Sequence, residues 1–255
     1  MKYSVAFVLL FLGTTSFSCF SEPLSETKPI AKISYDDPRD PFEKFNRTMW
    51  EFNYQYLDRY LVRPVAYGYK DYVPNPMKSG IDNFVRNLDE PSSLVNNMLQ
   101  GKWSSAANAG GRFVVNSTIG LAGLVDVANM MGLDRKQDDF SEVLAYYGAP
   151  NGPYFMVPFF GPHTSLELAS DWVDGLYFPL SELTMLQSLV KWGLKSLNSR
   201  AEAIDQERLI DNSLDSYSFV KDAFYQHLDY KIYDGAVPIE HEDDDLLDEY
   251  LDELD

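Results

Sequence analysis

Residues 40–60, DPFEKFNRTMWEFNYQYLDRY, carry a large apolar residue at nearly every turn of a helix. Asp40 is a favoured helix-capping residue and Pro41 is tolerated in a first turn, so we expect the helix to begin here. Its apolar stripe repeats every three or four residues and consists of Phe42, Phe45, Met49, Phe52, Tyr56 and Tyr60. The stripe predicts a long amphipathic helix that lies in a protein core or against lipid.

Proline, glycine and helical periodicity mark five further helices, over residues 75–88, 91–101, 102–117, 181–203 and 217–229. The third of these contains small residues that let a neighbouring helix approach closely, namely Ala106, Ala107, Ala109, Gly110 and Gly111. The pattern predicts an all-α body over residues 40–239, interrupted by irregular segments that are rich in glycine, proline and aromatic residues.

The segment from Ile119 to Leu133 alternates glycine with leucine, valine and methionine around a single acid. Glycine adopts backbone conformations that other residues avoid, so Gly120, Gly123 and Gly132 can act as hinges. We interpret this segment either as a hinge or gate that controls access to a cavity, or as a buried loop packed under helices.

The stretch from Val143 to Leu166 contains no Asp, Glu, Lys or Arg and many aromatic residues. It is long enough to cross a bilayer, but its repeated prolines and glycines exclude a continuous transmembrane helix. We predict an irregular segment in or against the membrane interface, where aromatic side chains concentrate. A rigid aromatic loop in the protein core is the alternative.

The first residues have the composition of an export signal. Lys2 supplies a positive start, and the uncharged residues that follow lead to the only cysteine, Cys19. We predict a signal peptide over residues 1–18, a lipid attached covalently to Cys19, such as palmitate, and a flexible tether over residues 19–39. Ser16 stands where bacterial lipoproteins usually have leucine, so simple secretion with a free thiol is the alternative.

The formal net charge is −18, and residues 240–255 hold ten acids and no lysine or arginine. We predict that this acidic tail is disordered and solvated, because it has too little apolar content to offset its ordering entropy. The negative charge of the whole chain argues against nucleic acid as a partner.

Sequence motifs of enzymes and metal sites are absent: there is no nucleophile elbow, no zinc-protease motif, no phosphate-binding glycine loop and no cysteine pair. The chain is therefore predicted not to be an enzyme and to need no metal or cofactor. A hydrolase built from Ser165, His163 and Asp171 is a much weaker hypothesis, since Ser165 lacks the strained turn that exposes a nucleophile.

Two groups of polar residues have a structural and a functional interpretation. Lys191 falls among apolar neighbours, so it either extends its amine to water or contacts a phosphate head group. Asp82, Asn83, Arg86 and Asn87 are interpreted as solvated helix faces and caps rather than as a site.

Five motifs, in order along the chain, give a family resemblance. They are DPFEKFNRTMWEFN (40–53), RPVAYGYKDYVP (63–74), NLDEPSSLVNNMLQG (87–101), RFVVNSTIGLAGLVDVA (112–128) and YGAPNGPYFMVPFFGP (147–162). In these motifs and their spacing the chain resembles the MlaA/VacJ family of Gram-negative outer-membrane lipoproteins.

The resemblance implies a ring-like bundle of amphipathic helices, embedded in the inner leaflet of the outer membrane and enclosing a polar pore. It implies a lipid-anchored protein, facing the periplasm, that removes mislocalised phospholipids from the outer leaflet. Its partners would be phospholipids, a periplasmic lipid carrier of the MlaC type and a trimeric porin. This function maintains the lipid asymmetry of the outer membrane and requires no bond to be broken.

Within that interpretation, the residues expected to contact the bilayer are aromatic: Phe45, Phe52, Phe155, Phe159 and Phe160.

The alternative from another class is a structural envelope lipoprotein that bridges its partners through the acidic tail. Removing the tail should abolish bridging but leave transport intact.

Overall fold

The structure is a computed structural model that describes residues 37–237. The predicted signal peptide, Cys19, most of the tether and the acidic tail lie outside the described residues. Within residues 37–237, helices dominate, and the strands β1 (Tyr154–Val157) and β2 (Gly161–Thr164) pair in one short hairpin. The predicted helical fold class is confirmed.

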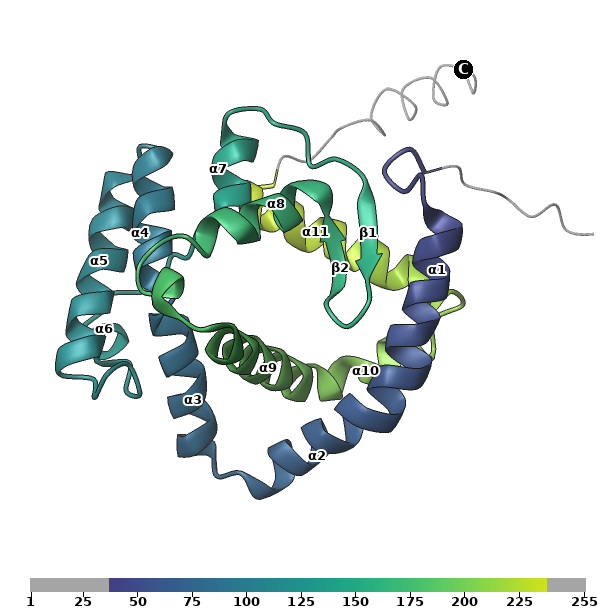
Figure 1. The fold of residues 1–255 in the computed structure, drawn as a ribbon, viewed down its shortest axis with the longest axis horizontal. Coiled ribbons are helices and arrows are strands. Elements are labelled where there is room, and N and C mark those ends of the chain that lie inside the picture. The colour runs from purple at the N-terminus through teal and green to yellow at the C-terminus, as the bar shows by residue number, and fades with distance from the viewer. Residues whose placement is uncertain (1–36, 238–255) are drawn as a thin grey trace, which may run out of the picture. The chain divides into compact units, whose positions relative to one another are not determined.

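One continuous helical run forms the first side of the fold (Figure 1). It consists of α1 (Glu43–Glu51), the π-helix η1 (Phe52–Val62) and α2 (Arg63–Tyr72). The predicted long amphipathic helix is confirmed and extends further, to Tyr72. Its π-helical middle was not predicted, and such wider turns are rare and frequently occur at functional sites.

Four further helices follow along the chain: α3 (Asn75–Asn87), α4 (Glu90–Leu99), α5 (Trp103–Thr118) and α6 (Val127–Met130). The first three have bounds close to the expected ones, whereas the short α6 was not predicted. Helices α4 and α5 pack against each other. A Cβ on Gly110 would lie 2.6 Å from Leu94 Cδ1. The prediction that small residues allow close helix approach is confirmed at this position.

The hairpin corrects the expectation for residues 143–166. In place of an irregular segment, Tyr154 pairs with Thr164 and Val157 with Gly161 in antiparallel register. Tyr154 and Met156 point into the core, because alternate residues of a strand face opposite sides. The alternative of an aromatic core element holds for Tyr154, whereas Tyr146, Tyr147, Phe159 and Phe160 are exposed and their place at a membrane interface stays a prediction. Helices α7 (Phe140–Tyr146) and α8 (Ser165–Asp174) flank the hairpin.

The chain ends its described part in helical elements: η2 (Leu180–Glu182), α9 (Met185–Glu202), η3 (Ala203–Gln206), α10 (Glu207–Asp211) and α11 (Ser216–Ile232). Figure 1 shows the elements of residues 37–237 following one another around a ring, with α9 passing through its middle. Helix α9 packs against α2 and α3. No helix in this part of the chain is both long and apolar enough to cross a bilayer.

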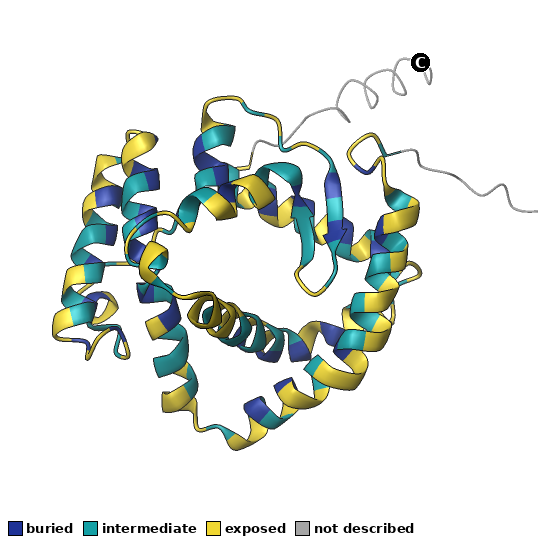
Figure 2. Cartoon of the chain, viewed as in Figure 1, coloured by how far each residue is buried: buried dark blue, intermediate teal, exposed yellow. Residues whose placement is uncertain are grey.

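Burial runs opposite to the usual pattern of water-soluble proteins. The apolar core is small and lies where β1 meets α11, around Tyr154, Met156 and Tyr217. Among the described residues, 21 polar or charged residues are buried but only 14 apolar ones. The aromatic stripe of α1 and η1 is largely exposed, with Phe45 at 51% and Tyr60 at 74% (Figure 2). Lipid rather than water suits such a surface.

Asp40 corrects a second expectation, because its side chain does not cap α1. It is buried and accepts hydrogen bonds from Asn46 Nδ2 (2.7 Å) and Tyr217 Oη (2.5 Å). The amide of Asn46 also donates to Tyr154 O (3.0 Å). A buried carboxylate needs such donors, so Asp40 joins α1 to α11.

Candidate functional site

Two cavities lie on opposite faces of the chain from α9 into η3. Asn198, Ala201, Glu202 and Asp205 line one of them, whereas Ser196, Ser199, Arg200 and Ala203 line the other. Each set repeats at intervals of three, four and seven residues, which is the spacing of one helix face. The two sets are offset by two residues and therefore face in nearly opposite directions.

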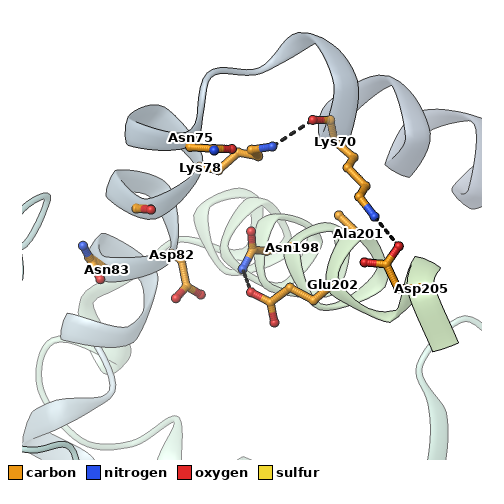
Figure 3. Close-up of a pocket in the computed structure, with 10 residues that line it drawn as sticks. Lys70, Asn75, Lys78, Asp82, Asn83, Asn198, Ala201, Glu202 and Asp205 are labelled. Atoms are coloured by element: carbon orange, nitrogen blue, oxygen red, sulfur yellow. Dashed lines mark hydrogen bonds and ion pairs between the residues drawn. The ribbon is translucent and has the colours of Figure 1, made fainter.

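The first, which we call the polar cavity, has a volume of about 620 Å³ and lies between α2, α3 and the end of α9 (Figure 3). Every lining residue except Ala201 is polar or charged. Helix α3 contributes a polar stripe at helical spacing, formed by Asn75, Lys78, Ser79, Asp82 and Asn83. This stripe lies opposite the polar face of α9.

Hydrogen bonds and ion pairs fix the charged groups of the polar cavity. Lys78 Nζ donates to the backbone oxygen of Lys70 (2.8 Å), and Lys70 Nζ pairs with Asp205 Oδ1 (2.8 Å). Asn198 Nδ2 donates to Glu202 Oε1 (3.1 Å). Two ammonium groups and several carboxylates thus lie around one space, which can accommodate a group carrying both signs of charge.

Tyr69 lies beside these carboxylates in the same region. Burial raises the pKa of its hydroxyl, and the negative charges of Asp82 and Glu202 raise it further. The hydroxyl is buried and has no hydrogen-bond partner among the described residues. Tyr69 therefore stays neutral over the physiological pH range.

The second, which we call the apolar cavity, has a volume of about 580 Å³ and lies between η1, the hairpin turn and helices α9 to α11. Most of its lining side chains are apolar or aromatic, including Trp50, Leu57, Phe159, Phe160, Ile210 and Val220. Asp58, Arg200 and Glu207 also line it and make part of its wall charged.

Those three residues and Arg63 form what we call the charged cluster. Arg200 donates to both Asp58 oxygens, at 2.7 and 2.9 Å, and its Nη2 lies 3.4 Å from Glu207 Oε2. Arg63 pairs with Asp58 (3.3 Å) and with Glu207. The hydrogen-bonded Asp58 carboxylate raises the pKa of Arg200. Two cations and two anions therefore neutralise one another beside an apolar space.

Gly120 and Gly123 lie in a tight turn between α5 and α6. A Cβ on Gly120 would lie 2.3 Å from Val125 O, and one on Gly123, at φ +93°, would lie 2.8 Å from Asn87 Cβ. Gly132 also has a positive φ, +83°, but its Cβ position is open. The first two glycines are thus required for the turn itself, and the gate stays a prediction.

The segment around these glycines is neither buried nor loosely attached. Leu121 is 67% exposed, so the interpretation as a buried loop is wrong there. Arg112, fully buried in α5, donates to Asp126 Oδ2 (2.8 Å) and to Leu133 O, and it also pairs with Glu90 (2.8 Å). Arg112 therefore holds two points of the predicted gate.

Aromatic pairs link the first helical run to the hairpin and include three of the predicted bilayer contacts, Phe52, Phe155 and Phe159. Phe52 packs edge-on against Phe159, with ring centroids 5.5 Å apart, and Phe155 stacks on Phe42 at 5.2 Å. Phe45 and Phe160 are exposed, while Phe155 is half-buried. Their contact with lipid stays a prediction, and Phe159 and Phe160 also line the apolar cavity.

Lys191 forms an ion pair with Asp89, its Nζ lying 2.6 Å from Oδ1. Its amine is therefore already occupied by a carboxylate, and a phosphate head group would have to compete for it. The head-group contact stays a prediction.

The weak hydrolase hypothesis finds little support in the geometry. His163 Nε2 lies 3.9 Å from Asp171, and the hydrogen bonds of the described residues include none between His163 and Ser165. Within residues 37–237, no group of three His, Cys, Asp or Glu is placed to hold a metal.

The interpretation of Asp82, Asn83, Arg86 and Asn87 as a solvated helix face and caps is wrong for Asn87. Asp82 and Asn83 line the polar cavity, and Asn87 is buried and donates to Ser117 Oγ (3.0 Å). These residues are not simply a solvated face. The helical spacing of these residues predicts that they share one face of α3. The neighbouring sequence does not show that this face lies opposite the polar face of α9.

A helical ring with one polar cavity, one apolar cavity and many exposed aromatic residues is the arrangement expected of a protein that handles lipid. A family model described as MlaA lipoprotein matches residues 38–231. The chain belongs to this family.

Individual relatives agree over most of the chain. The intermembrane phospholipid transport system lipoprotein MlaA of Escherichia coli is 41% identical over 194 residues, which cover 75% of this chain and 77% of the relative. The protein of the same name from Haemophilus influenzae is 35% identical over 236 residues, 91% of each chain. A solved structure, described as the structural basis for maintenance of bacterial outer membrane lipid asymmetry, superposes with a TM-score of 0.73 at 41% identity. It covers 76% of this chain, and 98% of the solved chain is matched.

Proposed function

We propose that this protein removes mislocalised phospholipids from the outer leaflet of a Gram-negative outer membrane and passes them to a periplasmic lipid carrier. The polar cavity carries the proposal, because it lies inside a body whose outward faces are rich in exposed aromatic residues. The names of the relatives, which refer to intermembrane phospholipid transport, support the same function.

The physical role of the cavity is to replace hydration for the head group. Moving a charged group through hydrocarbon is costly, and polar side chains along the route lower that cost. Lys70 and Lys78 would stabilise the phosphate, and Asp82 and Glu202 would stabilise a head-group amine. Lys191 is a further cation for this route. The lipid changes its location without any bond being broken.

The proposal includes a membrane anchor and two protein partners. A lipid on Cys19, which lies outside the described residues, would hold the body at the membrane with its carrier side toward the periplasm. A carrier of the MlaC type would receive the phospholipid, and a trimeric porin would surround or support the ring. The family membership and the exposed aromatic surface are what support these assignments.

Exposed aromatic residues on α1 would set the depth of the body in the lipid. Phe45→Asp should reduce the membrane-bound fraction, because a charge facing hydrocarbon is unfavourable. Lys44→Asp, at an exposed position of the same helix that already carries a charge, is the matched control. A membrane-bound fraction equal to wild type for Phe45→Asp would place this face away from lipid.

The gate at Gly120, Gly123 and Gly132 is best tested at Gly132. Valine at the first two positions would collide with backbone or with Asn87, so it would disturb the fold as well as any motion. Gly132→Ala meets no atom, but its φ of +83° is strained for a residue with a Cβ, so circular dichroism must first show that the variant keeps the wild-type fold. We expect slower lipid transfer with membrane attachment unchanged, and an unchanged rate would remove the gate.

Two alternatives make different predictions. A structural envelope lipoprotein that bridges partners through the acidic tail should lose function when residues 240–255 are deleted, whereas the transporter should keep it. A hydrolase should release fatty acid from phospholipid vesicles and lose that activity in Ser165→Ala.

Phospholipid transfer in proteoliposomes tests the proposal directly. The purified lipidated protein, with a porin partner, is inserted into liposomes that contain a labelled phospholipid, and the carrier is added outside. We expect carrier loading above that of empty liposomes, without fatty-acid release. Lys78→Glu should reduce loading, whereas Lys44→Glu, exposed on α1, should not. No loading by the wild type would overturn the proposal.

A further inference from the structure

We propose that the apolar cavity binds one acyl chain of a phospholipid, with the polar end of that chain directed toward the charged cluster. This inference rests on the proposed function and adds a site to it. Transport then involves two compartments on the two faces of α9, one for the polar part of the lipid and one for a chain.

The walls of the cavity suit a flexible hydrocarbon. Trp50, Leu57 and Val220 come from three different helical elements and enclose a space of about 580 Å³. This volume lies within the range of about 300–1,000 Å³ that is typical of small-molecule sites. Each methylene group of a chain that leaves water for such a space is stabilised by the hydrophobic effect.

The charged cluster supplies the polar end of an amphiphile site. Glu207 is 7% exposed, and its Oε2 has no hydrogen-bond partner among the described residues. Arg200 Nη2 lies 3.4 Å from this oxygen as an ion pair but does not hydrogen-bond to it, so the oxygen can still accept from an incoming ammonium or hydroxyl group. Arg63 and Arg200 lie beside it and offer donors to ester or phosphate oxygens.

The hairpin turn holds aromatic rings against the cavity at a conformational cost. Phe159 has a φ of +70°, a left-handed conformation that is strained for a large side chain. Asn53 stabilises it, because its Oδ1 accepts from Phe159 N and its Nδ2 donates to Val157 O, both at 2.9 Å. The strain and its support keep Phe159 and Phe160 at the cavity wall.

Hydrocarbon fits this space better than a polypeptide segment does. Every residue of an inserted peptide would bring a backbone N–H and C=O that need hydrogen-bond partners. The apolar walls around Leu57, Ile210 and Val220 provide none from their side chains. An acyl chain has no such requirement over its length and needs polar partners only at its ester end, where the charged cluster lies.

Fluorescence of Trp50 provides the test, since this side chain lines the cavity. Trp103, Trp172 and Trp192 are replaced by Phe, and the protein is placed in lipid nanodiscs of phosphatidylcholine brominated along its acyl chains. We expect the bromine atoms to quench Trp50. Ala203→Phe and Val220→Phe, which fill the cavity from two sides, should each remove that quenching, whereas Ala107→Phe, exposed on α5, should leave it.

Quenching that persists in both folded cavity-filling variants would come from lipid outside the cavity and would overturn the inference. Circular dichroism of each variant establishes folding, and two fillers keep the test valid if one fails to fold. Normal carrier loading by the filled variants, with unquenched Trp50 in the unfilled protein, would refute the chain site but leave the transport function. Quenched Trp50 with no carrier loading by wild type would refute transport and leave the chain site.

Discussion

Two ion pairs join the first helical run to the region of α9 and η3, and they differ mainly in burial. Lys70 and Asp205, at the polar cavity, have side chains that are 34% and 82% exposed. Arg200 and Asp58, at the apolar cavity, are 17% and 12% exposed and pair through two hydrogen bonds. Exposed pairs contribute little to stability, whereas removing one partner of a buried pair is strongly destabilising.

The comparison separates two uses of the same chemistry. The Lys70–Asp205 pair is weak enough to open and exchange partners with a phosphate or an amine. The Arg200–Asp58 pair forms part of the wall of the apolar cavity. Because both side chains are largely buried, separating them would leave two charges with little water to solvate them. The charged side chains at the polar cavity can therefore exchange partners with a ligand, whereas those at the apolar cavity stay paired with one another.

Arg200→Met should have the largest effect. It removes one of the two cations that the buried Asp58 and Glu207 share and leaves only Arg63 for both carboxylates, at a cost of about 3–5 kcal/mol in the free energy of unfolding. Thermal unfolding in detergent micelles, followed by circular dichroism, measures it. Arg208→Met is the control, because Arg208 is exposed and makes no ion pair with the described residues. Equal losses for the two variants would mean that the charged cluster does not hold the wall.

Glu142 extends the comparison of exposed and buried ion pairs. It is buried, and it shares its only nearby cation among the described residues, Lys231, with Asp139. Lys231 lies 3.4 Å from Glu142 but only 2.7 Å from Asp139. Burial raises the pKa of Glu142 to about 8, with Lys231 opposing the rise and Asp139 and Asp138 adding to it. Between the ordinary pKa of a glutamate and about pH 8, Glu142 therefore stays protonated in the folded protein, whereas the same side chain is ionised in the unfolded chain.

Because the folded state binds more protons, stability should fall as pH rises from about 5 to about 8, by on the order of 3 kcal/mol from this group. Glu142→Gln cannot ionise and should flatten that part of the profile. Denaturation midpoints of both proteins across this pH range test the effect. A slope that is the same in the variant would exclude Glu142 as its source.

The apolar cavity also depends on neutral hydrogen bonds, which should contribute less than the charged cluster. Asn53→Ala removes both contacts to the hairpin turn and should cost about 1–2 kcal/mol. It should also release Phe159 from its strained conformation. Asn129→Ala, at an exposed position of α6, is the matched control for thermal unfolding. If Asn53→Ala lowered the free energy of unfolding no more than Asn129→Ala does, the hairpin turn would keep its conformation without the two hydrogen bonds of Asn53.

Local periodicity was enough to predict most helices and the exposed aromatic face of α1. The hairpin was missed because its supports are distant in sequence: Tyr154 N donates to Arg39 O, and Asn46 binds Tyr154 and Met156. Prolines and glycines in residues 143–166 argued against regular structure, and no local pattern revealed these partners. Asp40 was misassigned for the same reason, since Tyr217 lies far along the chain.

The candidate site shows the same limit. The polar stripe of α3, including Lys78 and Asp82, can be read from helical spacing, and so can the two faces of α9 around Asn198 and Arg200. Spacing shows that a stripe exists but not whether it faces water or another stripe. The opposing stripes lie more than a hundred residues apart, so only the fold shows that they enclose a cavity.

Lys70→Met should have the smallest effect on stability and a clear one on function. Because Asp205 is largely exposed, losing the pair should cost below about 1 kcal/mol. Transfer of an anionic phospholipid should nevertheless slow, because one of the two ammonium groups at the polar cavity is gone. Lys70→Arg keeps the charge and should retain transfer. If Lys70→Met destabilised the fold as much as Arg200→Met, the Lys70–Asp205 pair would also be structural. Lys70 would then not be available to bind a phosphate in the polar cavity.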